Sequence, residues 1–148
     1  VLSTSLIGVL QVYCFLILAN FFDVSFSFFH LLTSFPVFLI CAFMFGMFGL
    51  VLSLTVSQLE NFAGVMNFVI FPCFFLSSAL YPIWKIKESS PFLAILTQYN
   101  PFTHAVELIR FSLYGNFNLL SFYYILFFTF FCSVVSLLVY SKKNIIIR

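Results

Sequence analysis

Three ionisable side chains stand close together in a chain that is otherwise very poor in charge. His104, Glu107 and Arg110 follow one another at intervals of three residues. An imidazole and a carboxylate can transfer protons or bind a metal ion, and a guanidinium can hold a carboxylate or another anion. Charged residues make up 7% of the sequence, against about 25% in ordinary soluble domains. A cluster of charge in this chain therefore needs a physical reason.

A short helix is predicted to position these three side chains. Asn100 and Pro101 indicate its start, because Asn is a preferred N-cap and Pro is favoured at the first helical position. Gly115 indicates its end, near Tyr114, because Gly commonly follows the last helical turn. A helix of about 14 residues is about 21 Å long, which is too short to cross a bilayer.

The spacing allows each neighbouring pair on this helix to touch, and three interpretations follow. In the first, Glu107 and Arg110 form an ion pair that anchors the helix, because either charge alone near lipid is costly. In the second, the cluster lines or gates an exit for a substrate. In the third, it binds a metal or transfers protons, but one His and one Glu are too few ligands for zinc, and no activated nucleophile is nearby. We therefore expect a structural role and no catalytic residue, metal or cofactor.

The composition indicates an integral membrane protein. Of the 148 residues, 64% are hydrophobic and 22% are aromatic, and 25 are Phe. A soluble domain of this size would expose much of this apolar surface to water, so we expect the lipid bilayer as a partner. The net charge of +2 is too small to indicate binding to nucleic acid.

Four apolar runs are long enough to be transmembrane helices, since a span needs about 20 residues. They lie at about residues 2–22, 35–56, 62–81 and 120–140. All four are expected to be helical, because an open sheet cannot satisfy its backbone hydrogen bonds in lipid. The predicted fold is therefore a single all-α integral membrane domain over residues 1–148.

A re-entrant external hairpin of short helices is predicted before the last span, at about residues 90–115. Its first helix follows Ser90 and Pro91, a second pair of cap and first-position residues. Pro82 is expected to end the third span. Pro72, inside that span, removes a backbone donor and predicts a kink, either as a packing feature or as a hinge.

The second span carries a stripe of small residues on one helical face. The stripe comprises Ala42, Gly46, Gly49, Ser53 and Ser57. Small residues let the backbones of two helices approach closely in lipid. We favour a helix–helix contact here over a chance scatter of small residues on a lipid-facing helix.

Basic residues after the last span set the predicted orientation. Lys142, Lys143 and Arg148 place the C-terminus in the cytoplasm, because Lys and Arg near span ends favour that side. The turn at residues 57–61 is then cytoplasmic as well, and the long connection at 82–118 lies on the far side of the membrane.

Three strings of the sequence resemble one known family. They are Met-Asn-Phe-Val-Ile-Phe-Pro at 66–72, Phe-Leu-Ser-Ser-Ala-Leu-Tyr-Pro at 75–82 and Asn-Pro-Phe-Thr-His-Ala-Val-Glu-Leu-Ile-Arg at 100–110. They are similar to the C-terminal half of type-2 ABC exporter permeases of the nodulation-factor, polysaccharide and multidrug branch, in particular to permeases associated with pyrroloquinoline-quinone-dependent alcohol oxidation systems. The motif and structural positions are Pro72, Pro82, Asn100, Pro101, Thr103, His104, Glu107, Arg110 and Gly115.

The resemblance implies the membrane-spanning permease subunit of an exporter in the bacterial inner membrane. Members of the family have six spans, dimerise and bind a separate ATP-binding-cassette ATPase, so the spans here correspond to the third to the sixth. Because the chain begins at Val1 without the first two spans, we expect a C-terminal fragment that does not transport by itself. Gln58 and Glu60 are candidate contacts with the ATPase, or else residues of an ordinary solvated turn.

Two functions of other classes stay open beside the permease. One is a non-catalytic membrane scaffold or assembly protein. The other is a membrane-embedded enzyme, which would need His30, His104 and Glu107 to converge, although His30 lies in the separate loop at residues 23–34.

Overall fold

A computed structural model describes residues 1–22, 27–56 and 59–146, and every regular element within these ranges is an α-helix. The elements are α1 (Leu2–Asn20), α2 (Phe28–Thr33), α3 (Phe35–Thr55), α4 (Leu59–Phe75), α5 (Ile83–Ser89), α6 (Pro91–Tyr99), α7 (Pro101–Leu113) and α8 (Leu119–Ile146). The expectation of an all-α fold is therefore confirmed for the described residues.

In the described part of the chain, three helices are long and apolar enough to cross a membrane. They are Leu2–Asn20, Phe35–Thr55 and Leu119–Lys142, which correspond to the first, second and fourth predicted spans. Helix α8 continues to Ile146, so the first residues of the predicted basic tail extend the last helix.

The predicted third span, by contrast, does not reach Tyr81. Helix α4 has 17 residues and ends at Phe75, and the chain then bends through residues 76–81. The reason is that side chains bond the carbonyls at the helix end. The Ser77 hydroxyl donates to Phe74 O at 2.6 Å, and the Asn100 amide donates to Cys73 O at 2.5 Å and to Leu76 O, just beyond the helix, at 3.1 Å. Satisfied carbonyls allow a helix to stop where the apolar run alone would continue it.

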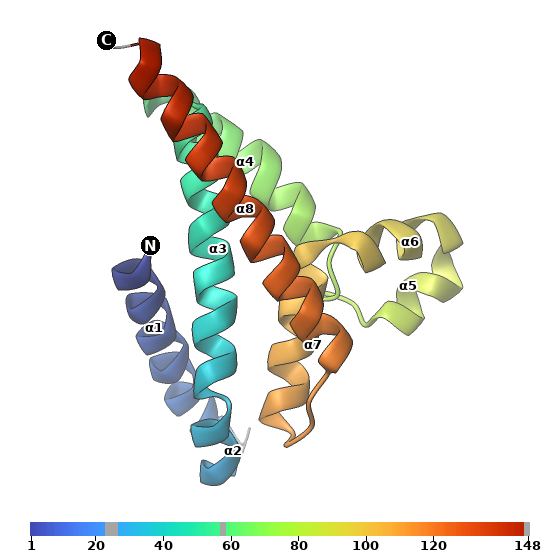
Figure 1. The fold of residues 1–148 in the computed structure, drawn as a ribbon. Helices are drawn as coiled ribbons and strands as arrows, with labels where there is room; N and C mark the ends of the chain where they lie inside the picture. The colour runs from blue at the N-terminus through green and yellow to red at the C-terminus, as the bar shows by residue number, and fades with distance from the viewer. Residues whose placement is uncertain (23–26, 57–58, 147–148) are drawn as a thin grey trace.

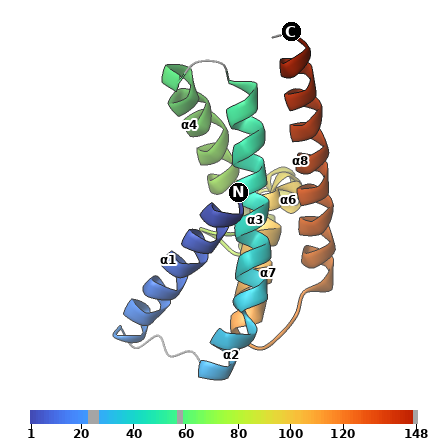
Figure 2. The ribbon, with the colours of Figure 1, turned by 60° about the vertical axis from the view of Figure 1, so that its left-hand side comes forward.

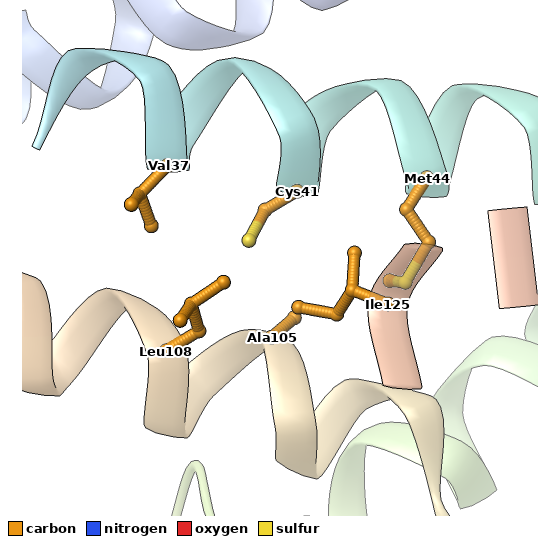
Figure 3. Close-up of a cluster of buried hydrophobic side chains, with 6 residues drawn as sticks. All are labelled: Val37, Cys41, Met44, Ala105, Leu108 and Ile125. Atoms are coloured by element: carbon orange, nitrogen blue, oxygen red, sulfur yellow. The ribbon is translucent and has the colours of Figure 1, made fainter. Parts of the chain in front are cut away.

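Helices α3, α7 and α8 form the centre of the molecule. Helix α3 runs along α8, and α7 lies beside both (Figure 1). Figure 3 shows the core between them, where α3 contributes three side chains, α7 two and α8 one. These buried residues are Val37, Cys41, Met44, Ala105, Leu108 and Ile125. Packing on two long helices thus fixes the position of the short helix α7.

Helix α1 packs antiparallel on the opposite side of α3, as Figure 2 shows. The small residues of α3 make part of this contact: a Cβ on Gly46 would lie 2.9 Å from Val1 Cγ1, and Gly8 faces Ala42. A Cβ on Gly49 would meet nothing within 4 Å. The predicted helix–helix contact is therefore confirmed at Ala42 and Gly46 but does not extend to Gly49. Ser57, the last residue of the predicted stripe, lies outside the described residues.

Two short helices form where the sequence indicated only loops. Helix α2 occupies part of the predicted loop at residues 23–34, and α5 precedes the predicted hairpin. Pro82 is the N-cap of α5, so it begins a helix instead of ending the third span. Together α5 and α6 project to one side of the bundle (Figure 1).

Candidate functional site

Helix α7 begins and ends close to where the sequence predicted. Asn100 is the N-cap, its Oδ1 accepts a hydrogen bond from Phe102 N at 3.0 Å, and Pro101 is the first helical residue. At the other end Gly115 has φ 76°. Asn116 N donates to Phe111 O and Gly115 N to Ser112 O, which is the Schellman arrangement that favours glycine at this position.

One face of α7 holds the bend that follows α4. The Arg110 guanidinium donates from Nη1 to Glu107 Oε1 at 2.9 Å and from Nη2 to Ser78 O at 3.0 Å. Thr103 Oγ1 accepts from Ser78 N at 3.3 Å. At about 100° per residue, positions 100, 103, 107 and 110 fall within about 80° of rotation. They therefore form a single polar row, and the Glu107–Arg110 ion pair is part of a contact between two segments.

The two serines of the bend are buried although they are polar. Ser77, Ser78 and Thr103 are each exposed by no more than 1%. Within the described part of the chain, Ser78 Oγ is buried and has no hydrogen-bond partner. The N-cap Asn100 and two residues of α7, Thr103 and Arg110, bond four backbone groups of the segment 73–78. A displacement of the bend would therefore displace α7 as well.

His104 points to other neighbours, α6 and α8. Its Nε2 is 2.8 Å from Gln98 O, its Nδ1 is 3.3 Å from Ser121 Oγ, and its ring stacks on Tyr124 with 3.9 Å between ring centres. Because a carbonyl only accepts, Nε2 carries the proton, and Nδ1 of the neutral ring accepts from Ser121. Burial lowers the pKa of His104, while the Gln98 carbonyl and the Glu107 charge oppose that shift. The neutral ring therefore links three helices.

A cavity of about 550 Å³ opens beside this histidine, between α6, α7 and the start of α8. Thr103, His104 and Glu107 supply polar groups to its wall, and Tyr99 and Tyr124 supply aromatic rings. The combination suits a molecule with an apolar body and a polar group. The sequence did not single out Ser121 and Tyr124, since only the stack on His104 distinguishes them from other residues of an apolar span.

His30 lies in a different place from His104. It lines a second cavity of about 300 Å³ together with Gly115, and a Cβ added to Gly115 would lie 2.7 Å from His30 Nε2. His104 and Glu107 line the larger cavity instead. The convergence of His30, His104 and Glu107 that an embedded enzyme would need is not present. Among the described residues, no group of three His, Cys, Asp or Glu side chains is placed to hold a metal.

Two further candidate residues, Pro72 and Glu60, belong to α4, and Pro72 does not line this cavity. Pro72 is inside α4, and its carbonyl accepts from Leu76 N at 2.9 Å. Glu60 belongs to the first turn of α4. Gln58 lies outside the described residues, so the expected contact of this turn with an ATPase stays a prediction.

Comparison with known proteins gives one match. A family model described as ABC-2 type transporter matches residues 1–114, a range that includes α1 to α7 and the polar row. No curated protein and no solved structure matches the chain.

Proposed function

Because the chain belongs to the ABC-2 type transporter family, we propose that it is the permease subunit of an exporter whose energy comes from ATP hydrolysed by a separate subunit. Proteins of this family are multi-pass membrane components of ABC transporters. The proposal adds the direction of transport, a bacterial inner membrane and a second copy of the permease as a partner.

We place four segments across the membrane, α1, α3, α4 and α8, with the C-terminus in the cytoplasm. The weakest case is α4, because 17 residues extend about 26 Å against a hydrocarbon core of about 30 Å. Two carbonyls of the bend that follows it, Leu76 O and Ser78 O, accept from Asn100 and Arg110. This supports the proposal, because irregular backbone is tolerated at membrane depth where protein side chains satisfy it. The segment α5–α7 then forms the re-entrant external element.

The observation that carries the proposal is the polar row of α7. It ties α7 to the end of α4 through Asn100, Thr103 and Arg110. His104 ties the same helix to α6 and α8. A shift of α4 driven by an ATPase would therefore change the cavity beside His104. We propose that this cavity lies on the exit path of an amphiphilic substrate and that α7 is the outer gate.

The experiment uses the full-length permease with the ATP-binding-cassette subunit that co-purifies with it, reconstituted in lipid vesicles. We expect the permease to change the rate of ATP hydrolysis, because the membrane subunit and the ATPase share one conformational cycle. The matched comparison is the ATPase in empty vesicles of the same lipid. A stable complex whose ATPase rate is indifferent to the permease would contradict the proposal and favour a scaffold.

A further inference from the structure

Helices α5 and α6, with Tyr81 and Pro82 before them, form an arm (residues 81–99) that stands away from the core. The two helices pack on each other, and the arm projects from the bundle in Figure 1. Its link to the rest runs through its last residues, where Tyr124 donates to Tyr99 O and His104 bonds Gln98 O. The arm meets the bundle at these last residues and at Ile83, which lines the cavity beside His104, and its other faces are exposed.

These exposed faces carry large apolar side chains. Trp84 is exposed by 64% and Phe92 by 68%, and further large apolar side chains on α6 are exposed beside them. These are Leu93, Ile95 and Leu96. Only Ala94 and Thr97 of α6 are buried, three residues apart on its inner face. Contiguous exposed apolar surface of this kind marks a contact with lipid or protein.

The anchor of the arm sets its depth relative to α8. Tyr124 lies five residues after Leu119, the first residue of α8, which is about 7.5 Å along the helix axis. Because α8 is long and apolar enough to span a membrane, its first turns lie near the membrane surface. Helices that lie in the plane of the interface bury their apolar face by about 5–10 Å, which is the depth of this anchor.

The polar groups of the arm fit the same layer. Lys85, Lys87 and Glu88 are its charged residues, and two lysines against one glutamate leave one net positive charge. Lys85 Nζ lies 5.9 Å from the centre of the Tyr81 ring, and all three charged side chains are exposed. Trp and Tyr concentrate at the level of lipid headgroups, and lysine keeps its ammonium there while its stem lies along apolar surface.

We propose that the arm lies in the membrane interface and that Lys85 and Lys87 bind the headgroups of anionic phospholipids. Aromatic and aliphatic side chains of α5 and α6 enter the acyl boundary, and the two ammonium groups meet the phosphates. The contact requires insertion in a bilayer but not transport, so it stands or fails independently of the ATP-driven cycle.

Trp84 is the only tryptophan in the sequence and reports on the arm directly. The full-length protein is reconstituted in equimolar phosphatidylcholine and phosphatidylglycerol, with bromine on the acyl chains of one lipid or of the other. Bromine quenches tryptophan on contact, and total bromine is equal in the two preparations. The Trp84→Phe variant supplies the background. Both leaflets have the same composition, so the result does not depend on orientation.

We expect quenching by both brominated lipids, and roughly fivefold stronger quenching by brominated phosphatidylglycerol, because about 1 kcal/mol per charge near an anionic surface acts on one net positive charge. Lys85→Gln with Lys87→Gln should remove the preference and keep the quenching. The matched variant Glu88→Gln should strengthen the preference, and high salt should abolish it. No quenching by either lipid would show that water or a protein covers the arm, and equal quenching would show that the lysines select no headgroup; either result overturns the proposal.

Discussion

Helices α6 and α7 start with the same local signal and end in different environments. Ser90-Pro91 begins α6 and Asn100-Pro101 begins α7. Ser90 makes no side-chain capping bond, whereas Asn100 caps α7 and also bonds two carbonyls of the segment after Pro72. Helix α7 is packed in the core, while α6 exposes most of its apolar residues. A cap signal therefore predicts where a helix starts. The further contacts of the cap residue determine whether that helix is packed in the core.

Asn100→Ala should give the largest effect, because it removes a cap and leaves two carbonyls without their donor. About 1 kcal/mol for the cap and about 1 kcal/mol for each lost hydrogen bond give a loss of about 3 kcal/mol of unfolding free energy. Ser90→Ala is the matched control at the start of α6 and should change stability by less than about 0.5 kcal/mol. Denaturation of the full-length protein in mixed detergent measures both. Similar losses for the two variants would remove the distinction between the helices.

Gly115→Ala tests the other end of α7 and should cost about 2 kcal/mol. The residue has φ 76°, which costs about 1–2 kcal/mol with a side chain, and its Cβ would lie 2.7 Å from His30 Nε2. Gly49→Ala is the control, since a Cβ there meets nothing within 4 Å, and helical alanine should be neutral or stabilising. His30→Ala in the Gly115→Ala background should recover part of the loss. If it recovers none, His30 does not press on this turn.

Arg110→Ala should cost about 1–2 kcal/mol, because Glu107 and the Ser78 carbonyl both lose a charged donor. The exposed fraction of 38% for the Arg110 side chain keeps the value moderate. Arg110→Lys should lose less, since one ammonium can reach one of the two acceptors. Lys87→Ala, on the exposed arm, should be close to neutral. The yield of folded full-length protein ranks the three variants, and equal, wild-type yields for both Arg110 variants would contradict a bracing role.

Acidification should give the smallest effect. Burial lowers the pKa of His104 below its ordinary value of 6.5, so the unfolded chain takes up a proton more readily than the folded one. Stability is then independent of this group above pH 6.5 and falls as pH decreases below that value, by at most about 1.4 kcal/mol per unit. Unfolding measured between pH 7.5 and 5.5 should show this slope in the wild type. A His104→Gln variant with an unchanged slope would assign it to another group.

Helices α6 and α7 show which features short-range sequence rules can predict. The start of α7 at Pro101 and the turn at Gly115 follow from rules that act within four residues, and the structure places its end at Leu113, one residue from the expected Tyr114. The predicted end of the third span, at residue 81, is six residues too late, because α4 ends at Phe75. Its true end depends on a bond from Asn100, which is 24 residues beyond Leu76 in the sequence. The stack of His104 on Tyr124 was missed for the same reason, since 20 residues separate the two rings along the chain.

The sequence by itself determined the membrane class, three long apolar helices, the limits of α7 and an ion pair three residues apart, because composition and local spacing carry that information. The tertiary structure decided what α7 holds. Its side chains bond the carbonyls of Cys73, Leu76, Ser78 and Gln98. Every residue has a backbone carbonyl, so the sequence does not show which carbonyls accept hydrogen bonds from these side chains. Only folding shows which carbonyls meet the polar side chains of a short helix.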